Sequence, residues 1–396
     1  MGRVFFEERK FESLNDIKEY IMKISACYIA KNEEKNIGRS IASLQTAVDE
    51  IIVVDTGSED KTKEIAASFG AKIFDFVWCD DFAKARNFAL EQATGDGIVF
   101  LDADEAFENS EGLRKNLEIM LAQKNIDVWL LPRKNIEKRT DGGISVIDYD
   151  YSARVLKNSK KLRYSGRIHE SPQRAERDIA WGYAEKSMML LHDGYAGDIC
   201  EEKARRDLKI LLEEVKARGN ILRYAFYLSD CYYILKDYAK ALSYAEMHVN
   251  ADTGLVGGES HMYHVGLECM RKLDTPLEKQ IHWTEGARDK FPELPDFHAE
   301  KGVLLSAAGR MEEAKAELLD ALIIFEEKKY PLYYSSSFSE TVAAMVSLRL
   351  AEISVVLGEY SDAELYFSMA LKYDGDNNDV KSKLWRIRDR MKGLER

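Results

Sequence analysis

Four short apolar runs alternate with amphipathic stretches in the first hundred residues, and this alternation constrains the fold more than any other feature. The runs fall at residues 24–30, 50–54, 71–76 and 97–101, and a helical pattern follows each of the first three. The first, second and fourth runs are almost wholly apolar, which is typical of strands buried on both faces of a parallel sheet. The sequence therefore predicts an α/β domain with a mainly parallel sheet, right-handed crossovers and a ligand crevice at the carboxyl ends of its strands.

Acidic residues stand directly after two of these runs. Asp55 follows the second run, and Asp102 and Asp104 follow the fourth. If the chain stays extended, Asp102 and Asp104 leave on one face and can share one cation. Mg²⁺ or Mn²⁺ carrying a substrate diphosphate is the cation that such a pair suits. An isolated Asp-x-Asp is more often a solvated turn, and Asp55 could equally cap the next helix. The arrival of three carboxylates at one edge favours a ligand site.

Length and composition narrow the remaining possibilities. A chain of 396 residues is long enough for two or three domains. Its net charge of -12 and pI near 5.3 argue against a nucleic-acid partner. The five cysteines show no Cys-x-x-Cys spacing, so neither a zinc site nor a disulfide framework is expected, and a reducing cytoplasm fits best. We expect no signal peptide or transmembrane segment, and a short amphipathic helix in residues 1–22.

The second half of the chain carries a different pattern. Apolar residues recur at helical spacing, and small residues recur at fixed offsets within a repeated helix pair, as at Gly302, Ala314 and Ala321. We predict an N-terminal extension at 1–22, an α/β domain at 23–197 and an all-α domain of tetratricopeptide-like repeats at 198–396. Such arrays either hold a peptide or protein in a groove or act as a packing and dimerisation module, and the sequence leaves both open.

The motifs of the first half resemble, in order and spacing, those of family 2 glycosyltransferases, which are metal-dependent inverting enzymes of the GT-A fold. The matching segments are K-N-E at 31–33, V-D-T-G-S at 54–58, W-C-D-D-F-A-K-A-R-N at 78–87 and L-D-A-D-E at 101–105. The resemblance implies a UDP-sugar donor. It also implies that Asn32, Glu33 and Asp55 contact the nucleoside and that Asp81 and Arg86 line the donor site. Asp102 would approach the ribose and the metal, and Asp104 would be the main metal ligand.

Two histidine segments extend this resemblance. Residues 164–172 resemble the family's H-G-[RK]-[IV]-H-E segment, although Tyr164-Ser165 replaces its usual aromatic-His pair. Inversion at an anomeric carbon needs one base opposite the leaving diphosphate, and we favour Glu170 as that base, with His169 orienting the substrate or taking the role itself. His192 begins an H-x-G-Y pattern that resembles the family's late metal histidine, so it is the third predicted metal ligand.

Together these features predict an inverting hexosyltransferase with Mg²⁺ or Mn²⁺ as cofactor. The combination of domains resembles bacterial peptide glycosyltransferases that modify bacteriocin cysteines, which implies transfer of glucose from UDP-glucose to a peptide or protein side chain. Other family members use cell-surface glycan or lipid-linked acceptors, and that alternative stays open. A repeat scaffold whose sheet domain has lost activity is a third reading, and a homodimer is compatible with all three.

Overall fold

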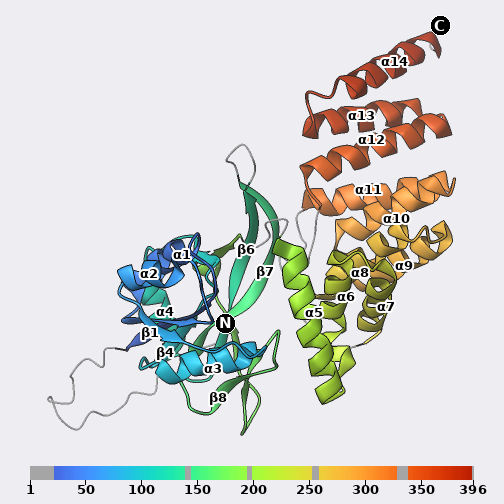
Figure 1. Ribbon diagram of the computed structural model, residues 1–396. Coiled ribbons are helices and arrows are strands. Elements are labelled where there is room, and N and C mark those ends of the chain that lie inside the picture. The colour runs from blue at the N-terminus through green and yellow to red at the C-terminus, as the bar shows by residue number, and fades with distance from the viewer. Residues whose placement is uncertain (1–21, 139–143, 194–198, 252–257, 328–337, 395–396) are drawn as a thin grey trace. The chain divides into compact units, whose positions relative to one another are not determined.

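The computed structural model describes residues 22–138, 144–193, 199–251, 258–327 and 338–394, and the helix expected in residues 1–22 lies almost wholly outside them. The chain divides into two compact units (Figure 1). The first contains the residues up to 131 together with 152–165 and 170–190, and the second contains 132–151, 166–169 and the residues from 191 onward. The domain boundaries expected from composition, at 22/23 and 197/198, remain predictions.

The predicted βαβαβαβ alternation is observed in the first unit. Its elements are β1 (Ile24–Ala30), α1 (Ile37–Leu44), β2 (Glu50–Asp55), α2 (Thr62–Ser68), β3 (Lys72–Asp75), α3 (Phe82–Gln92) and β4 (Gly97–Phe100). These strands are parallel in the order β3-β2-β1-β4, so their carboxyl ends share one edge. The bounds of β1 and α3 equal the predicted ones.

The two faces of this sheet are covered by different helices (Figure 1), and β1 shows why its sequence is almost wholly apolar. Ala26 and Tyr28 pack in one core cluster with residues of α1 and of α4 (Leu113–Ala122). Cys27, which points to the opposite face, packs in another cluster with residues of α3. Since successive side chains of a strand alternate between faces, a strand covered on both sides is apolar at nearly every position. The buried Ser25 of β1 donates its hydroxyl to Glu50 at 2.7 Å.

The sheet continues beyond β4 with five more strands, of which the one next to β4 runs antiparallel to it, so the sheet is mixed rather than only parallel. The additional strands are β5 (Glu105–Phe107), β6 (Val128–Lys138), β7 (Ile144–Lys157), β10 (Trp181–Tyr183) and β11 (Leu190–His192). β7 runs antiparallel to β4, with Val99 opposite Val155. A separate hairpin joins β8 (Leu162–Ser165) to β9 (Ser171–Arg174). The predicted strand at 127–131 is only the beginning of β6.

The second unit contains ten helices among the residues that the structure describes. They are α5 (Ile199–Arg218), α6 (Ile221–Ile234), α7 (Tyr238–Val249), α8 (Gly258–Lys272), α9 (Leu277–Lys290), α10 (Pro295–Ala307), α11 (Met311–Glu327), α12 (Glu340–Leu357), α13 (Tyr360–Tyr373) and α14 (Asn378–Leu394).

From α6 onward the helices pack as successive pairs (Figure 1). Small residues allow close approach within a pair, because a Cβ atom at Gly302 of α10 would lie 2.6 Å from Leu318 Cγ of α11. Ala314 and Ala321, two other predicted small positions, are fully buried. The helical array predicted for this half is therefore observed. In the part of the chain that is described, no helix has the length and apolarity needed to cross a membrane.

Candidate functional site

Asp55 ends β2 at the shared carboxyl edge, and its two carboxylate oxygens have different surroundings. Oδ1 accepts hydrogen bonds from the main-chain N–H groups of Gly57 and Ser58, at 3.0 and 2.9 Å. Gly57 has a φ of +104°, which favours glycine in this turn. Oδ2 is buried and has no hydrogen-bond partner among the described residues. One oxygen therefore shapes the turn, and the other is a buried acceptor that receives no hydrogen bond from the described residues.

The loop after β1 is tied to the loop after β2. Asn32, with a φ of +57°, receives a hydrogen bond at Oδ1 from the Glu59 N–H, and its own N–H donates to Ser58 Oγ, each at 2.9 Å. The Glu33 N–H donates to Thr62 Oγ1 at 2.7 Å. These contacts place Asn32 and Glu33 beside the turn of Asp55, so the structure brings together the three residues predicted to contact the nucleoside.

Acidic and basic side chains alternate in a row of ion pairs near the carboxyl edge of the sheet. Arg86 of α3 donates through Nε to Glu170 Oε1 and through Nη2 to Asp102 Oδ1, the latter at 2.9 Å. Arg154 of β7 donates to the other oxygen of Asp102, and its Nε and Nη2 contact the two oxygens of Glu105 at 2.6 and 2.8 Å. Glu105 is fully buried. Asp102 thus lies between two arginines, and Arg86 links it to Glu170.

The Arg86 side chain is buried and lies against two aromatic rings. Its guanidinium carbon lies 4.5 Å from the Phe100 ring centroid and 5.4 Å from that of Tyr164. Burial alone would lower the pKa of Arg86, but the carboxylates of Asp102 and Glu170 outweigh it and raise that pKa. Nη1 of Arg86 and the Tyr164 hydroxyl are buried without hydrogen-bond partners among the described residues. Both are available to an anionic or polar ligand.

The Asp-x-Asp segment differs from the predicted geometry. The chain does not stay extended, because the Glu105 N–H bonds to the Asp102 carbonyl at 3.0 Å and closes a turn. Both Asp102 oxygens are engaged by arginines, and Arg39 Nη2 bonds the main-chain oxygen of Asp104 at 3.0 Å. A carboxylate together with diphosphate oxygens is a donor set that suits Mg²⁺ or Mn²⁺, and the metal role of Asp104 stays a prediction.

Asp81, predicted in the donor site, caps α3. Its Oδ1 accepts a hydrogen bond from the Lys84 N–H at 3.0 Å, and its backbone is extended as an N-cap requires. The cap fixes where α3 begins, and therefore where Arg86 stands on the helix. Asn87 ties α3 to β8, since its side-chain amide exchanges two hydrogen bonds with the main chain of Tyr164, at 2.8 and 2.9 Å.

His169 belongs to the second unit and stacks on Tyr227 of α6, with ring centroids 3.4 Å apart and planes 7° from parallel. The residue is exposed overall, so the stack covers mainly one ring face. Loss of water there, and secondarily the charge of Arg206, lower the pKa of the imidazole below its usual value. A lowered pKa makes His169 a weaker base.

His192 also lies in the second unit, at the end of β11. Its Nδ1 is 2.7 Å from Asn135 Oδ1, so a metal would be bound through Nε2. Asn135 of β6 lies 3.4 Å from Asp150 of β7, which pairs with Arg133 at 2.6 and 2.8 Å. Burial raises the pKa of Asp150, but Arg133 outweighs this and lowers it. The metal role of His192 stays a prediction.

Sequence reasoning missed Arg154, Glu105 and the polar group of Arg133, Asn135 and Asp150. The only local signal for the latter is the alternation of Arg133 and Asn135 along β6, which places both on one face. No local sequence pattern could have identified Arg154, because its pairing with Asp102 and Glu105 depends on the antiparallel register of β7 against β4.

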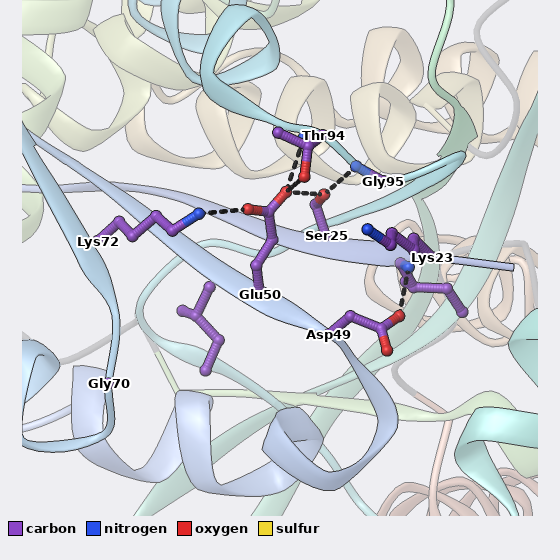
Figure 2. A pocket seen from close by; sticks show the side chains of 10 residues that line it. Lys23, Ser25, Asp49, Glu50, Gly70, Lys72, Thr94 and Gly95 are labelled. Carbon is purple, nitrogen blue, oxygen red and sulfur yellow. Dashed lines mark hydrogen bonds and ion pairs between the residues drawn. The ribbon is translucent and has the colours of Figure 1, made fainter. Parts of the chain in front are cut away.

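A cavity of about 350 Å³ lies at the opposite, amino-terminal edge of the sheet (Figure 2). The charge of Glu50 in it is already satisfied, since Lys72 Nζ, Ser25 Oγ and Thr94 N lie 2.8, 2.7 and 2.6 Å from its carboxylate. Burial would raise the pKa of Glu50, but these hydrogen bonds lower it to about 2. We interpret this acidic group as structural and do not place the donor site here.

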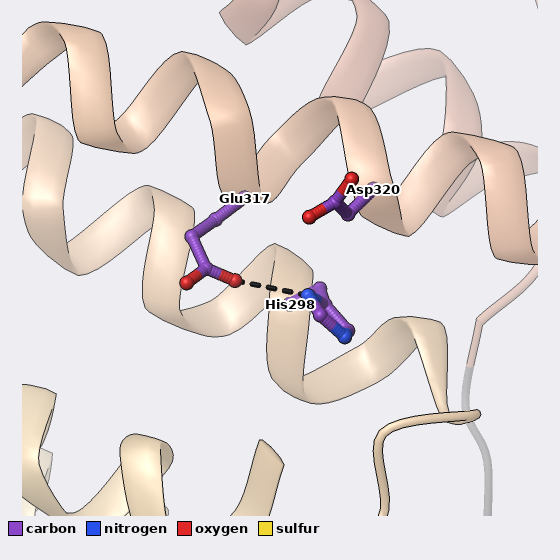
Figure 3. Close-up of side chains that lie close together, drawn as sticks. All are labelled: His298, Glu317 and Asp320. Atoms are coloured by element: carbon purple, nitrogen blue, oxygen red, sulfur yellow. Dashed lines mark hydrogen bonds and ion pairs between the residues drawn. The ribbon is translucent and has the colours of Figure 1, made fainter. Parts of the chain in front are cut away.

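A second cluster lies between α10 and α11, where the side chains of His298, Glu317 and Asp320 converge (Figure 3). Their ligand-type atoms lie within 4.8 Å of one another. Glu317 already accepts contacts from His298 Nδ1 at 2.9 Å, Arg288 Nη1 at 2.6 Å and Lys301 Nζ at 2.9 Å. A metal would compete with two cations, so we interpret the cluster as an ion-pair network.

This network makes a testable contribution to stability. Burial would raise the pKa of Glu317, but His298, Lys301 and Arg288 lower it to about 2 from 4.5. A lowered pKa stabilises the fold above about pH 4.5, and the gain is lost as pH falls toward about 2. We expect Glu317→Gln to reduce the free energy of unfolding by about 2 kcal/mol at neutral pH. Urea unfolding followed by circular dichroism should show this difference shrinking below pH 4.5.

The matched control is Glu313→Gln on the same helix. Among the described residues Glu313 forms its ion pair with Arg310, and its side chain is 57% exposed. Exposed pairs contribute little, so this change should stay within about 0.5 kcal/mol at every pH. Equal effects of the two substitutions would show that the network adds nothing to an ordinary surface pair.

The comparisons with known proteins concern the domain that carries these residues. Residues 25–169 match the family model for glycosyl transferase family 2, a segment that runs from β1 to His169. It contains every predicted site residue except Glu170 and His192. The chain therefore carries a family 2 glycosyltransferase domain.

Two relatives and one solved structure show how far this likeness extends. The chain is 37% identical over 150 residues to a TPR repeat-containing protein of Synechococcus elongatus, covering 37% of this chain and 35% of that protein. It is 26% identical over 232 residues to the SPbeta prophage-derived glycosyltransferase SunS of Bacillus subtilis, covering 57% and 53%. The matches thus span about a third and about half of these relatives.

The solved structure is glucosyl-3-phosphoglycerate synthase from Mycobacterium tuberculosis with Mn²⁺, UDP-glucose and phosphoglyceric acid. It is 25% identical, and the match covers 30% of this chain and 45% of that one. The TM-score of this match is 0.24, and we base no conclusion about the site on it.

Proposed function

We propose that the protein is a metal-dependent inverting glycosyltransferase that moves a hexose, glucose from UDP-glucose, to a side chain of a peptide or protein. The observation that carries the proposal is the buried and unpartnered Oδ2 of Asp55, at the strand edge that also holds Arg86, Asp102 and Glu170. A uracil nucleoside supplies the imide N–H that this acceptor lacks. The family 2 domain and the relative SunS support the class of reaction.

The residues divide into a nucleoside part and a diphosphate part. Asp55 accepts from the base, and Asn32 and Glu33 border the nucleoside from the loop after β1. Arg86 turns its unpartnered Nη1 to the diphosphate, where a guanidinium offsets charge and fixes orientation. Asp104 would hold Mg²⁺ or Mn²⁺, and when bound the ion offsets the negative charge that develops on the departing UDP.

Glu170 acts as the base in this proposal. It takes the proton of the acceptor nucleophile as the nucleophile attacks the anomeric carbon from the side opposite the diphosphate, and the bond from that carbon to the diphosphate oxygen breaks. An ion pair with Arg86 weakens a carboxylate as a base. A diphosphate that competes for Arg86 would release Glu170 when the donor is in place. His169, whose pKa is lowered, is the poorer candidate.

The test is release of UDP from a panel of UDP-sugars by the full chain. We expect slow release from one donor, UDP-glucose, in the presence of Mn²⁺ or Mg²⁺, because water replaces the missing acceptor. Chelation with EDTA should lower the rate at least about tenfold, since the diphosphate charge is then uncompensated. Added Mn²⁺ should restore the rate.

Calorimetric titration with UDP separates the remaining outcomes. UDP binding without donor turnover is expected when an acceptor is obligatory, and peptide and lipid-linked acceptors would then be compared for acceleration of UDP release. A folded chain that binds no UDP with or without Mn²⁺ would contradict the proposal and favour the scaffold reading.

A further inference from the structure

The last helix, α14, differs in charge from the rest of the chain. Between Asn378 and Leu394 it carries six basic residues and only two acidic ones, although the protein has a net charge of -12. Its apolar side chains at Val380, Leu384 and Ile387 are buried in the core of the helical array, and the helix packs on α13. The helix is thus a folded cap of this array.

Four residues form a stripe along another side of α14. Lys381, Trp385, Arg388 and Lys392 follow one another at intervals of four, three and four residues, which places them on one face of the helix. At the rise of an α-helix the stripe is about 16 Å long. All four residues are exposed. We call this face the basic stripe.

Half of the basic residues of α14 are engaged by the protein and half are not. Lys383 pairs with Glu352 at 3.0 Å and Arg388 with Glu364 at 2.6 Å, and Arg390 lies over the Tyr360 ring at 4.7 Å. Lys381, Arg386 and Lys392 have no ion pair with any other described residue. Two of these three lie on the basic stripe.

The exposure of Trp385 is not explained by the role of α14 as a polar cap of the helical array. The end of a helical array needs a polar outer face, and isolated lysines and arginines satisfy that need. Trp385 is 67% exposed, more than any of the other four tryptophans. Exposing an indole ring to water is unfavourable, so its place among cations suggests a surface that covers it.

We propose that the basic stripe docks on an anionic phospholipid surface. Cations attract the acidic headgroups, and a tryptophan among them enters the interface with its ring in the acyl boundary and its N–H in the headgroup layer. A bound peptide would need a groove or a strand edge, whereas Trp385 projects from the side of one helix and is too exposed to line a cleft. Because the chain is acidic elsewhere, this end faces the membrane.

Cosedimentation of the full chain with vesicles tests the proposal. We expect binding to vesicles of equal parts phosphatidylcholine and phosphatidylglycerol at low salt, with loss at high salt and weak binding to pure phosphatidylcholine. Lys381→Gln with Lys392→Gln should lower the partition coefficient by about tenfold or more. Trp385→Phe should remove a blue shift that anionic vesicles cause in the emission of the unaltered protein.

The matched control is Lys272→Gln with Lys279→Gln, two exposed lysines of the same unit without ion pairs among the described residues. This pair changes the net charge equally and should leave binding unchanged. If the two double substitutions reduce vesicle binding equally, the effect is one of net charge and the proposal is overturned. Equal binding to anionic and neutral vesicles would also overturn the proposal. The same holds if the basic stripe binds polyglutamate but the protein does not bind vesicles.

Discussion

Replacing Arg86 with methionine is expected to reduce the free energy of unfolding by about 3 kcal/mol and to lower UDP release at least about a hundredfold. Methionine preserves much of the volume between Phe100 and Tyr164 but removes the charge. The side chain of Glu170 is only 9% exposed, so it would be left as a buried carboxylate without its cation. Urea unfolding and the UDP-release assay measure the two effects separately.

A second substitution separates the structural effect from the chemical one. Arg86→Met combined with Glu170→Gln removes the uncompensated charge, so part of the lost stability should return. UDP release should stay low, because neither the diphosphate contact nor the base is present. Lys84→Met on the same helix is the control, since Lys84 is 67% exposed and its ion pair within the described part of the chain is with Asp81. If Arg86→Met destabilises the chain but leaves UDP release unchanged, Arg86 has no role in the donor site.

The fold of the first unit could be predicted because burial on both faces leaves a simple trace in the sequence. β1 has no polar alternation, since Ala26 and Tyr28 meet one layer of helices and Cys27 meets the other. The same rule failed for β6 and β7. Only residues 128–131 are continuously apolar, and the rest of the hairpin carries charged side chains such as Arg133 and Asp150. A polar strand resembles a loop in sequence.

The candidate site was predictable only in part, because it depends on contacts between distant segments. Asp55 and Asp102 were found from their place at strand ends. Arg154 was not, because it reaches Asp102 from a strand 52 residues away in an antiparallel register that no local pattern specifies. The strand-end position of Asp102 and Asp104 did not separate their roles, and only the family resemblance made Asp104 the main metal ligand. In the structure two arginines, Arg86 and Arg154, engage the two carboxylate oxygens of Asp102.

The two predicted histidines illustrate a further limit. A histidine in a motif can serve as base, ligand or packing residue, and the sequence fixes none of these. In the structure His169 has a ring face on Tyr227, and His192 has its Nδ1 beside Asn135. The first contact lowers the pKa of His169 and weakens it as a base, whereas the second leaves Nε2 as the nitrogen through which a metal would be bound. Glu170 thus remains the stronger candidate for proton transfer.

Asp55→Asn is expected to weaken UDP binding about a hundredfold and to narrow or reverse a preference for UDP over CDP. Asparagine keeps a carbonyl oxygen for the N–H groups of Gly57 and Ser58, so the turn is preserved. Its amide nitrogen replaces Oδ2 and presents a donor to the uracil imide N–H, which is also a donor. Cytosine carries an acceptor at that ring position, so CDP should lose less affinity. Calorimetric titration with both nucleotides and Mn²⁺ measures the change.

Stability gives this prediction a second, independent readout. A buried carboxylate oxygen without a partner is unfavourable in the free protein, so a neutral amide at position 55 should maintain or raise the melting temperature while ligand affinity falls. Asp75→Asn is the control, because Asp75 is the register partner of Asp55 on β3 and its side chain is 80% exposed. If Asp55→Asn lowers stability and weakens UDP and CDP equally, the carboxylate only shapes the turn. A fold that gains stability while losing UDP would indicate that Oδ2 is kept for a ligand.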